Sequence, residues 1–180
     1  MGAFHPKSRR RIAYWLTRVF CWLGRERPPR LVRRGRPVDP DFVPDELLYM
    51  RWRKRDLKQG RLDASVVRFP DQSVNRQKCS KPQDVLLPEP RNDKSKEWIY
   101  CGALKFPVHA VLRSIEVGGQ VICTFRVRHD PVEYNYAHSE IRVYREGQRI
   151  MDKKSITKEH RKQYRLAIME KLVIVTEPLM

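Results

Sequence analysis

The residues with the clearest potential for chemistry lie in the stretch RHDPVEYNYAHSEIR, residues 128–142. Apolar and polar residues alternate on both sides of its centre, which predicts two antiparallel strands joined through this stretch. Strand register follows the apolar alternation, so the apolar residues should share one face, with Phe125 opposite Val143. On the other face, the same register sets His138 opposite Asp130.

A histidine beside a carboxylate suits general acid or base catalysis, because the carboxylate makes the imidazole more basic and fixes its tautomer. We therefore take His138, Asp130 and Glu140 as candidate catalytic residues. Arg128, opposite Glu140, is a candidate phosphate ligand, and such a set would suit a metal-independent phosphodiesterase. The alternative is that these are ordinary cross-strand pairs on an exposed sheet face. The same register turns His129 toward the apolar side.

A second group of candidates lies in RFPDQSVNRQK, residues 68–78. The PDQS segment is typical of a turn, because Asp and Ser can bond their own backbone. The residues after it, Ser73, Asn75, Arg76 and Lys78, could bind a phosphate or read the edge of a base. The alternative is a turn followed by a solvated basic strand.

A third candidate is a helix predicted over residues 44–58. Pro44 suits the first turn of a helix, and Leu48 and Trp52 are one turn apart and should face the core. One face of this helix would carry the basic residues Arg51, Lys54, Arg55 and Lys58. A cationic helix face can follow a phosphate backbone, while Tyr49 and Trp52 could stack on unpaired bases. The alternative is a solvated charged face.

The N-terminal region, residues 1–40, has the composition of a basic arm. Residues 1–36 contain eleven Lys or Arg and a single acid, Glu26, and so hold +10 of the net charge of +17. A helix is predicted over residues 9–23, with one apolar stripe formed by Ile12, Trp15, Leu16, Val19 and Leu23. A Pro/Arg-rich linker, extended and mobile, should follow over about 25–40. The stripe could dock on the rest of the chain, fill a partner's groove or lie on an anionic membrane.

Composition excludes several classes of protein. The four cysteines form no CxxC pair, so the sequence predicts no zinc site, and no cofactor-binding motif is present. No apolar run approaches the roughly 20 residues of a membrane span, and the N-terminus lacks a cleavage site typical of a signal peptide. The few, scattered cysteines favour a reducing, cytoplasmic location.

The remaining pattern predicts one α+β domain over residues 41–180, with an antiparallel β-meander and flanking helices. Strands are expected over residues 62–69, 97–106, 108–117 and 120–129, and over residues 139–148 after the loop. Gly118 and Gly119 predict a hairpin turn, and Thr157 should cap a final helix over residues 158–172.

The charge of +17 predicts a polyanionic partner. The leading hypothesis is a nucleic-acid-binding protein, RNA favoured over DNA, with ribonuclease-like, metal-independent cleavage as an added activity. The first alternative is a non-enzymatic basic subunit or adaptor whose arm docks on a protein partner within a larger, nucleic-acid-containing assembly. The second alternative is a membrane-surface protein anchored by residues 9–23. No cofactor is expected under any of the three.

Overall fold

A computed structural model describes residues 29–87, 100–111 and 113–175 of the chain. The predicted helix over residues 9–23, its apolar stripe and most of the basic arm lie outside these described residues. The described part is mostly β-structure, with one α-helix, so the α+β class with an antiparallel sheet holds at a coarse level.

The main sheet is antiparallel and follows the order β10-β5-β1-β4-β8-β7-β6, with β9 paired to β8. Its strands are β1 (Leu47–Arg53), β4 (Gln72–Arg76), β5 (Tyr100–Pro107), β6 (Ser114–Val117), β7 (Gln120–His129), β8 (His138–Arg145), β9 (Gln148–Arg149) and β10 (Val173–Ile174). A small hairpin pairs β2 (Leu57–Lys58) with β3 (Arg61–Leu62).

Short 3-10 helices connect the strands. They are η1 (Pro29–Leu31), η2 (Lys54–Asp56), η3 (Ala64–Val66), η4 (Gln77–Cys79), η5 (Pro82–Leu86), η6 (Val108–Ala110) and η7 (Lys153–Ser155). The α-helix, α2 (Lys158–Met169), begins where the Thr157 hydroxyl accepts a hydrogen bond from the backbone N–H of His160, so the predicted cap is confirmed.

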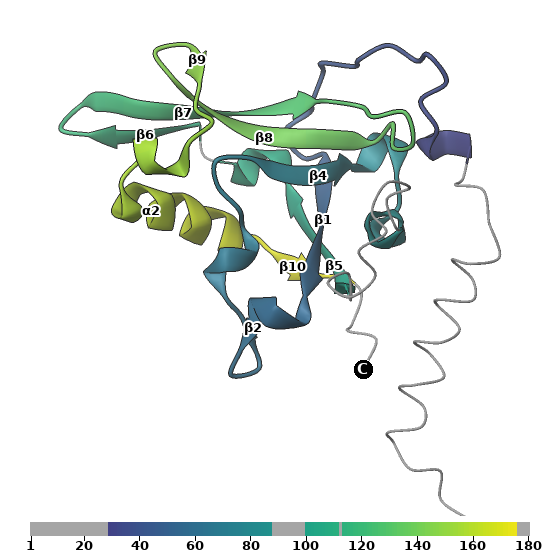
Figure 1. The fold of residues 1–180 in the computed structure, drawn as a ribbon, viewed down its shortest axis with the longest axis horizontal. Helices are drawn as coiled ribbons and strands as arrows, with labels where there is room; N and C mark the ends of the chain where they lie inside the picture. The colour runs from purple at the N-terminus through teal and green to yellow at the C-terminus, as the bar shows by residue number, and fades with distance from the viewer. Residues whose placement is uncertain (1–28, 88–99, 112, 176–180) are drawn as a thin grey trace, which may run out of the picture.

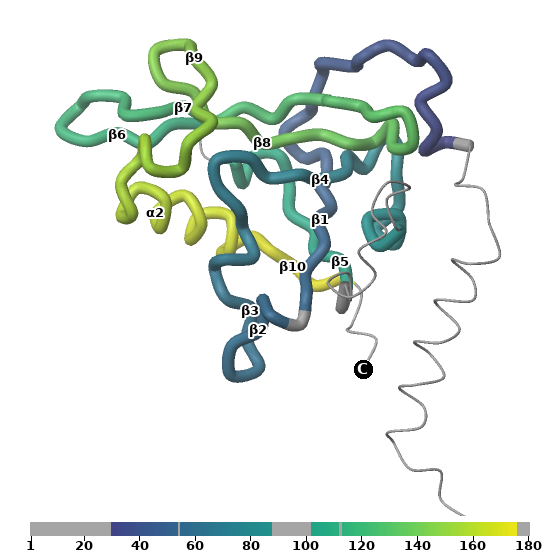
Figure 2. The backbone as a smooth tube through the Cα atoms, viewed as in Figure 1, coloured from purple at the N-terminus to yellow at the C-terminus, as the bar shows by residue number. Residues whose placement is uncertain are grey.

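The sheet is strongly curled. Figure 1 shows β7 and β8 crossing the view while β1 and β5 run down it, with α2 lying on the inner side of the bend. The tube in Figure 2 follows the same path and shows β10 alongside β5. We call the side that faces α2 the inner face and the opposite side the outer face. The curl therefore leaves the outer face without an α-helix among the described residues.

The hydrophobic core lies between the inner face and α2. Its largest buried side chains include Trp52 of β1, Phe106 of β5 and Ile141 of β8, which pack with Tyr164 and Ile168 of α2. The Tyr164 ring stacks on Phe125 at a centroid distance of 4.4 Å. Aromatic and aliphatic burial of this extent is the main force holding the helix to the sheet.

The predicted β7–β8 hairpin is confirmed in register. Phe125 pairs with Val143 and Arg128 with Glu140, as the apolar alternation required. The Asp130 backbone N–H donates to the carbonyl of His138, which continues the pairing by one step. The turn at Gly118 and Gly119 is also present, and both glycines have the positive φ that a tight turn needs.

The predicted helix over residues 44–58 is wrong, because residues 47–53 form β1. A spacing of four, as between Leu48 and Trp52, is compatible with one face of a helix and equally with one face of a strand. Met50 decides between them, since it is also buried in the core and shares a face with those two residues only in a strand. The two-residue alternation of a strand was therefore the correct signal over residues 47–53.

Three smaller expectations also differ from the structure. Residues 62–69 form the end of β3 and η3 rather than a continuous strand, and the strand expected over residues 108–117 is η6 followed by the shorter β6. Residues 29–40, expected to be part of a mobile linker, are packed on the sheet: Leu31 is fully buried, and its carbonyl accepts a hydrogen bond from the Tyr136 N–H. The apolar pair Leu31–Val32 among the arginines was the only sequence signal for this packing.

Candidate functional site

A row of paired residues crosses the outer face over four strands. The β-ladder sets Lys105 of β5 opposite Tyr49 of β1, Tyr49 opposite Asn75 of β4, and Asn75 opposite His138 of β8. Directly paired residues point to the same side of a sheet. A tyrosine, an amide and an imidazole from distant parts of the chain are thereby neighbours.

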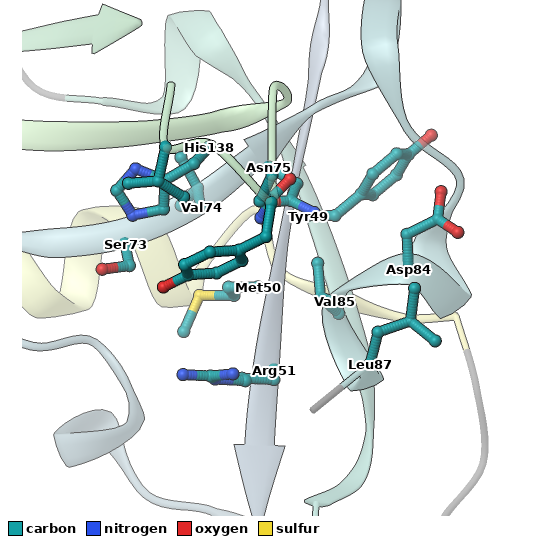
Figure 3. A pocket seen from close by; sticks show the side chains of 13 residues that line it. Tyr49, Met50, Arg51, Ser73, Val74, Asn75, Asp84, Val85, Leu87 and His138 are labelled. Atoms are coloured by element: carbon teal, nitrogen blue, oxygen red, sulfur yellow. The ribbon is translucent and has the colours of Figure 1, made fainter. Parts of the chain in front are cut away.

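A cavity of about 170 Å³ lies over this row. It is lined by Tyr49, Met50, Arg51, Ser73, Val74, Asn75, Asp84, Val85, Leu87, Val132, Tyr134, Asn135 and His138. Figure 3 shows His138 and Ser73 on one side and Val85 and Leu87 on the other, with Asn75 between the two sides and Arg51 toward one end. One wall is thus polar and the other aliphatic.

Two asparagines meet at the cavity. The Asn135 amide nitrogen donates to the Asn75 side-chain oxygen at 2.8 Å. Asn75 is only 3% exposed, yet its Nδ2 has no hydrogen-bond partner among the described residues, and neither has Oδ1 of Asn135. Buried polar atoms without partners are rare and costly in folded proteins, so this pair is a feature that requires an explanation.

The loop that carries Asn135 is held by hydrogen bonds within the loop and by contacts with Arg33 and Arg36. Within it, the backbone groups of Val132 and Asn135 exchange two hydrogen bonds. Arg33 donates from its backbone to Glu133 and from its side chain to the carbonyl of Pro131. The guanidinium of Arg36 lies 3.8 Å from the centre of the Tyr136 ring. The arginine-rich segment after η1 therefore supports the site, so Arg33 and Arg36 have structural contacts.

Arg76, expected to bind phosphate, is fully buried instead. Its guanidinium makes a forked ion pair with Glu46, at 2.8 and 2.9 Å, and also donates to the backbone carbonyls of Asp39 and Asp41. Burial is the largest single influence and opposes its charge, but the hydrogen bonds to Glu46 and the negative charges of Glu46 and Asp39 together raise the pKa of Arg76. Its donors are used within the protein, and it ties residues 39–46 to β4.

Lys78 lies next to this network but is exposed. Its ammonium group is 2.6 Å from a carboxylate oxygen of Asp39, and this ion pair lowers the pKa of that carboxyl and raises the pKa of Lys78. An exposed pair of this kind contributes little to stability. Lys78 is accessible to solvent, whereas Arg76 is not.

The predicted catalytic group is only partly assembled. The carboxylate of Asp130 binds Arg142 rather than His138, and Arg142 also binds Glu140 at 2.8 Å. His138 places Nδ1 2.7 Å from the backbone carbonyl of Asp130. Glu140, opposite Arg128 in register, pairs with Arg142 and Arg149. The predicted neighbours are therefore adjacent, but Arg142 takes both carboxylates.

The predicted basic helix face does not exist as one stripe. Arg51 belongs to β1 and lines the cavity, whereas Arg55 is exposed on η2. In β2, the ammonium nitrogen of Lys58 is 2.8 Å from a carboxylate oxygen of Asp63. Lys54 is the first residue of η2. The strand–turn–strand path separates these four cations, so only Arg51 contributes to the cavity.

The outer face nonetheless carries an excess of accessible cations on β7. Arg126 and Arg128 occupy alternate positions of this strand and are both exposed. Arg126 lies over the Tyr144 ring at 5.1 Å, and Arg128 forms no ion pair with any described residue. Arg142 and Arg149 share the carboxylates of Asp71, Asp130 and Glu140, so with Arg126 and Arg128 these seven groups carry a net charge of +1 beside the row that ends at His138.

His129 is a structural residue on the inner face, as the register predicted. The Asp39 backbone N–H donates to its Nδ1 at 2.9 Å, so that nitrogen is unprotonated, and Nε2 donates to the carbonyl of Tyr136. Burial lowers the pKa of His129, and the nearby charge of Arg76 acts in the same direction, while the Tyr136 carbonyl and the carboxylates of Asp39 and Glu46 act against it.

Lowering the pH should destabilise the protein through His129. A pKa below the ordinary value of about 6.5 means that the contribution of the neutral imidazole is complete above that pH and is lost as the pH falls through the lowered value. The free energy of unfolding should then decrease by at most about 1.4 kcal/mol per pH unit for this proton. Urea unfolding of wild type and His129→Gln between about pH 5 and pH 7 measures it. Equal pH slopes for the two proteins would contradict the assignment.

A second concave surface lies beside α2. Its lining includes Lys153, Lys158, Arg161, Lys162 and Arg165, together with Phe69. Arg165 donates to the carbonyl of Val67, and Arg161 to that of Lys153, so two of the five cations also have structural contacts. This groove offers charge, but its lining contains neither a tyrosine nor a side-chain amide.

Several residues of the site were missed from sequence. Tyr134 and Asn135 lie within the stretch that drew attention first, but only the folded loop brings them over β4. Val85 and Leu87, which form the aliphatic wall, lie in η5 and directly after it and belong to none of the sequence motifs. Arg142 could have been found, because arginine on a strand between two acidic neighbours competes for both of them.

Three broader features bear on function. Among the described residues, no helix is both long and apolar enough to span a bilayer, and no three His, Cys, Asp or Glu side chains gather as metal ligands would. Cys79 and Cys123 are free thiols, and burial raises the pKa of each. Searches with this chain find no matching protein-family model, no matching curated protein and no matching solved structure.

Proposed function

We propose that the protein binds single-stranded nucleic acid, with RNA favoured, on the outer face of its sheet. The observation that carries the proposal is the cavity over β1, β4 and β8, which combines tyrosine, amide and imidazole groups beside the exposed arginines of β7. Single-stranded nucleic acids need these two things together: cations for the phosphates and ring or amide surfaces for the bases.

The overall charge supports the same partner. The chain carries +17, and Asp130 and Glu140, on the outer face near β7, are paired with Arg142 and Arg149. A polyanion approaching this face therefore meets a positive potential and displaces few internal ion pairs. Lys105 extends the cationic surface to β5 at the other end of the row that contains Tyr49 and Asn75.

Replacing Arg126 and Arg128 together with glutamine should weaken the binding of a single-stranded RNA oligonucleotide. For each phosphate that the variant no longer neutralises, the slope of log affinity against log salt concentration should also fall by about 1. The slope is measured by fluorescence anisotropy at several salt concentrations. The matched control replaces Lys158 and Lys162 of α2 with glutamine, which removes the same charge from the groove on the other side of the core.

The outer-face proposal predicts a larger loss of affinity for the β7 double variant than for the α2 double variant. A larger loss of affinity for the α2 double variant would instead place binding in the groove beside α2. No measurable affinity of the wild-type protein at low salt would contradict nucleic-acid binding altogether.

Cleavage of the bound strand is a second proposal, favoured by the hydrogen bond of His138. A carbonyl can only accept a hydrogen bond, so the 2.7 Å distance to the Asp130 carbonyl places the proton on Nδ1 and leaves Nε2 free to act as a base. His138 also lines the cavity. His138→Gln should abolish any RNA cleavage by the wild-type protein while binding persists. Cleavage that survives this substitution would exclude His138 as the base.

A further inference from the structure

The asparagine pair at the cavity has a hydrogen-bonding capacity that is independent of how the two amides are oriented. With Asn135 donating to Asn75, the unpaired atoms are the nitrogen of Asn75 and the oxygen of Asn135. Turning both amides over reverses the internal bond and leaves the oxygen of Asn75 and the nitrogen of Asn135 unpaired. In either arrangement the pair leaves one donor group and one acceptor unpaired.

Asn75 and Asn135 both line a cavity sized for one ring, and their two unpaired atoms each have less than 1 Å² of accessible surface. Its volume of about 170 Å³ is close to that of an engineered cavity of roughly 150 Å³ that accommodates benzene. A whole nucleotide would exceed it, whereas a single heterocycle entering from outside would not. The walls suit the flat faces of such a ring, because Tyr49 and Tyr134 line the cavity together with Val85 and Leu87.

Nucleobases match both features. The edge of each base places a donor next to an acceptor, and a side-chain amide recognises such an edge through two hydrogen bonds. Bases that are not paired can also insert and stack on aromatic side chains. The ribose and phosphates would then remain outside, on the side where the β7 arginines are exposed and Lys105 ends the row.

We propose that this cavity takes up one unpaired nucleobase, whose donor–acceptor edge completes the hydrogen bonding of Asn75 and Asn135 when the two amides turn toward it. As a site for one base of a bound strand, it rests on the proposed RNA binding. Arg128 and the other cations of the outer face fix the backbone, and the amide pair supplies discrimination among bases. The base also removes the cost of leaving two buried polar atoms unpaired.

The test follows the side-chain amide signals of Asn75 and Asn135 by NMR in the isotope-labelled full chain. The probes are adenosine, cytidine, guanosine and uridine, ribose 5-phosphate, which lacks a base, and a single-stranded RNA octamer. Asn75→Leu and Asn135→Ser assign the two signals and remove one partner each, and retained backbone spectra show that each variant is folded. Gln83→Leu is the matched control, since it removes an amide from η5 outside the cavity lining.

We expect at least one nucleoside to shift both amide signals and ribose 5-phosphate to shift neither. Loss of one amide should weaken nucleoside binding at least about five-fold, as expected for a bidentate contact, while Gln83→Leu leaves it unchanged. An octamer that shifts backbone signals on β7 but not the two amides overturns the base site and leaves RNA binding intact. Nucleoside binding without octamer binding supports the base site and contradicts the proposed function. Shifts by ribose 5-phosphate equal to those by nucleosides overturn the base site.

Discussion

Replacing Arg76 with alanine is expected to lower the free energy of unfolding by about 3–5 kcal/mol. Arg76 is fully buried, and Glu46, its ion-pair partner, is 8% exposed. Without the guanidinium, the Glu46 carboxylate keeps a buried charge with no compensating cation. The carbonyls of Asp39 and Asp41 lose a donor as well.

Denaturant unfolding of wild type, Arg76→Ala and the double variant Arg76→Met with Glu46→Leu measures this effect. The double variant should recover most of the stability that Arg76→Ala removes, because replacing both partners of a buried pair with apolar groups is often neutral. Arg128→Ala is the control for an exposed arginine and should change stability by less than about 0.5 kcal/mol. An Arg76→Ala effect as small as that of Arg128→Ala would show that the network contributes nothing.

The second large effect is expected at Tyr164, where two substitutions should act in opposite ways. Tyr164→Ala removes a ring that is 1% exposed and packs against Phe125 and Phe69, and should cost about 3–5 kcal/mol. Tyr164→Phe keeps the ring and removes a buried hydroxyl that has no partner among the described residues. That variant should be as stable as wild type or more stable, because no hydrogen bond is removed.

Thermal and denaturant unfolding of the two variants test the packing of α2 on the sheet. Burial raises the pKa of Tyr164, so its phenol should not ionise at mildly alkaline pH in the folded protein, which ultraviolet absorbance can follow. A Tyr164→Phe variant that is less stable than wild type by about 1 kcal/mol or more would mean that the hydroxyl has a stabilising partner.

The β7–β8 register was predictable from sequence, because alternation over two long strands leaves only one pairing that buries both apolar sets. The ion pairs on that hairpin were not, since Arg142 and Arg128 were both plausible partners for Glu140. Which arginine binds Glu140 depends on how far each side chain reaches and on the position of Asp130. Only the folded geometry fixes both.

Residues 44–58 show the opposite case. A short segment with apolar residues four apart fits a helix as well as a strand, and its basic residues complete the pattern of an amphipathic helix. The sheet resolved the ambiguity by burying Met50 with Leu48 and Trp52 in the core. The intrinsic helix propensity of the segment was too weak to oppose the burial of these three residues.

The sequence by itself determined the high positive charge, the β-hairpin with its two inequivalent histidines, and the capped helix near the end of the chain. All three depend on composition or on contacts between residues close in the chain. Only the tertiary structure decided that Arg76 is buried and that Asn75 and Asn135 meet over a cavity. Those outcomes depend on contacts between residues 30 and 60 positions apart, which local pattern does not encode.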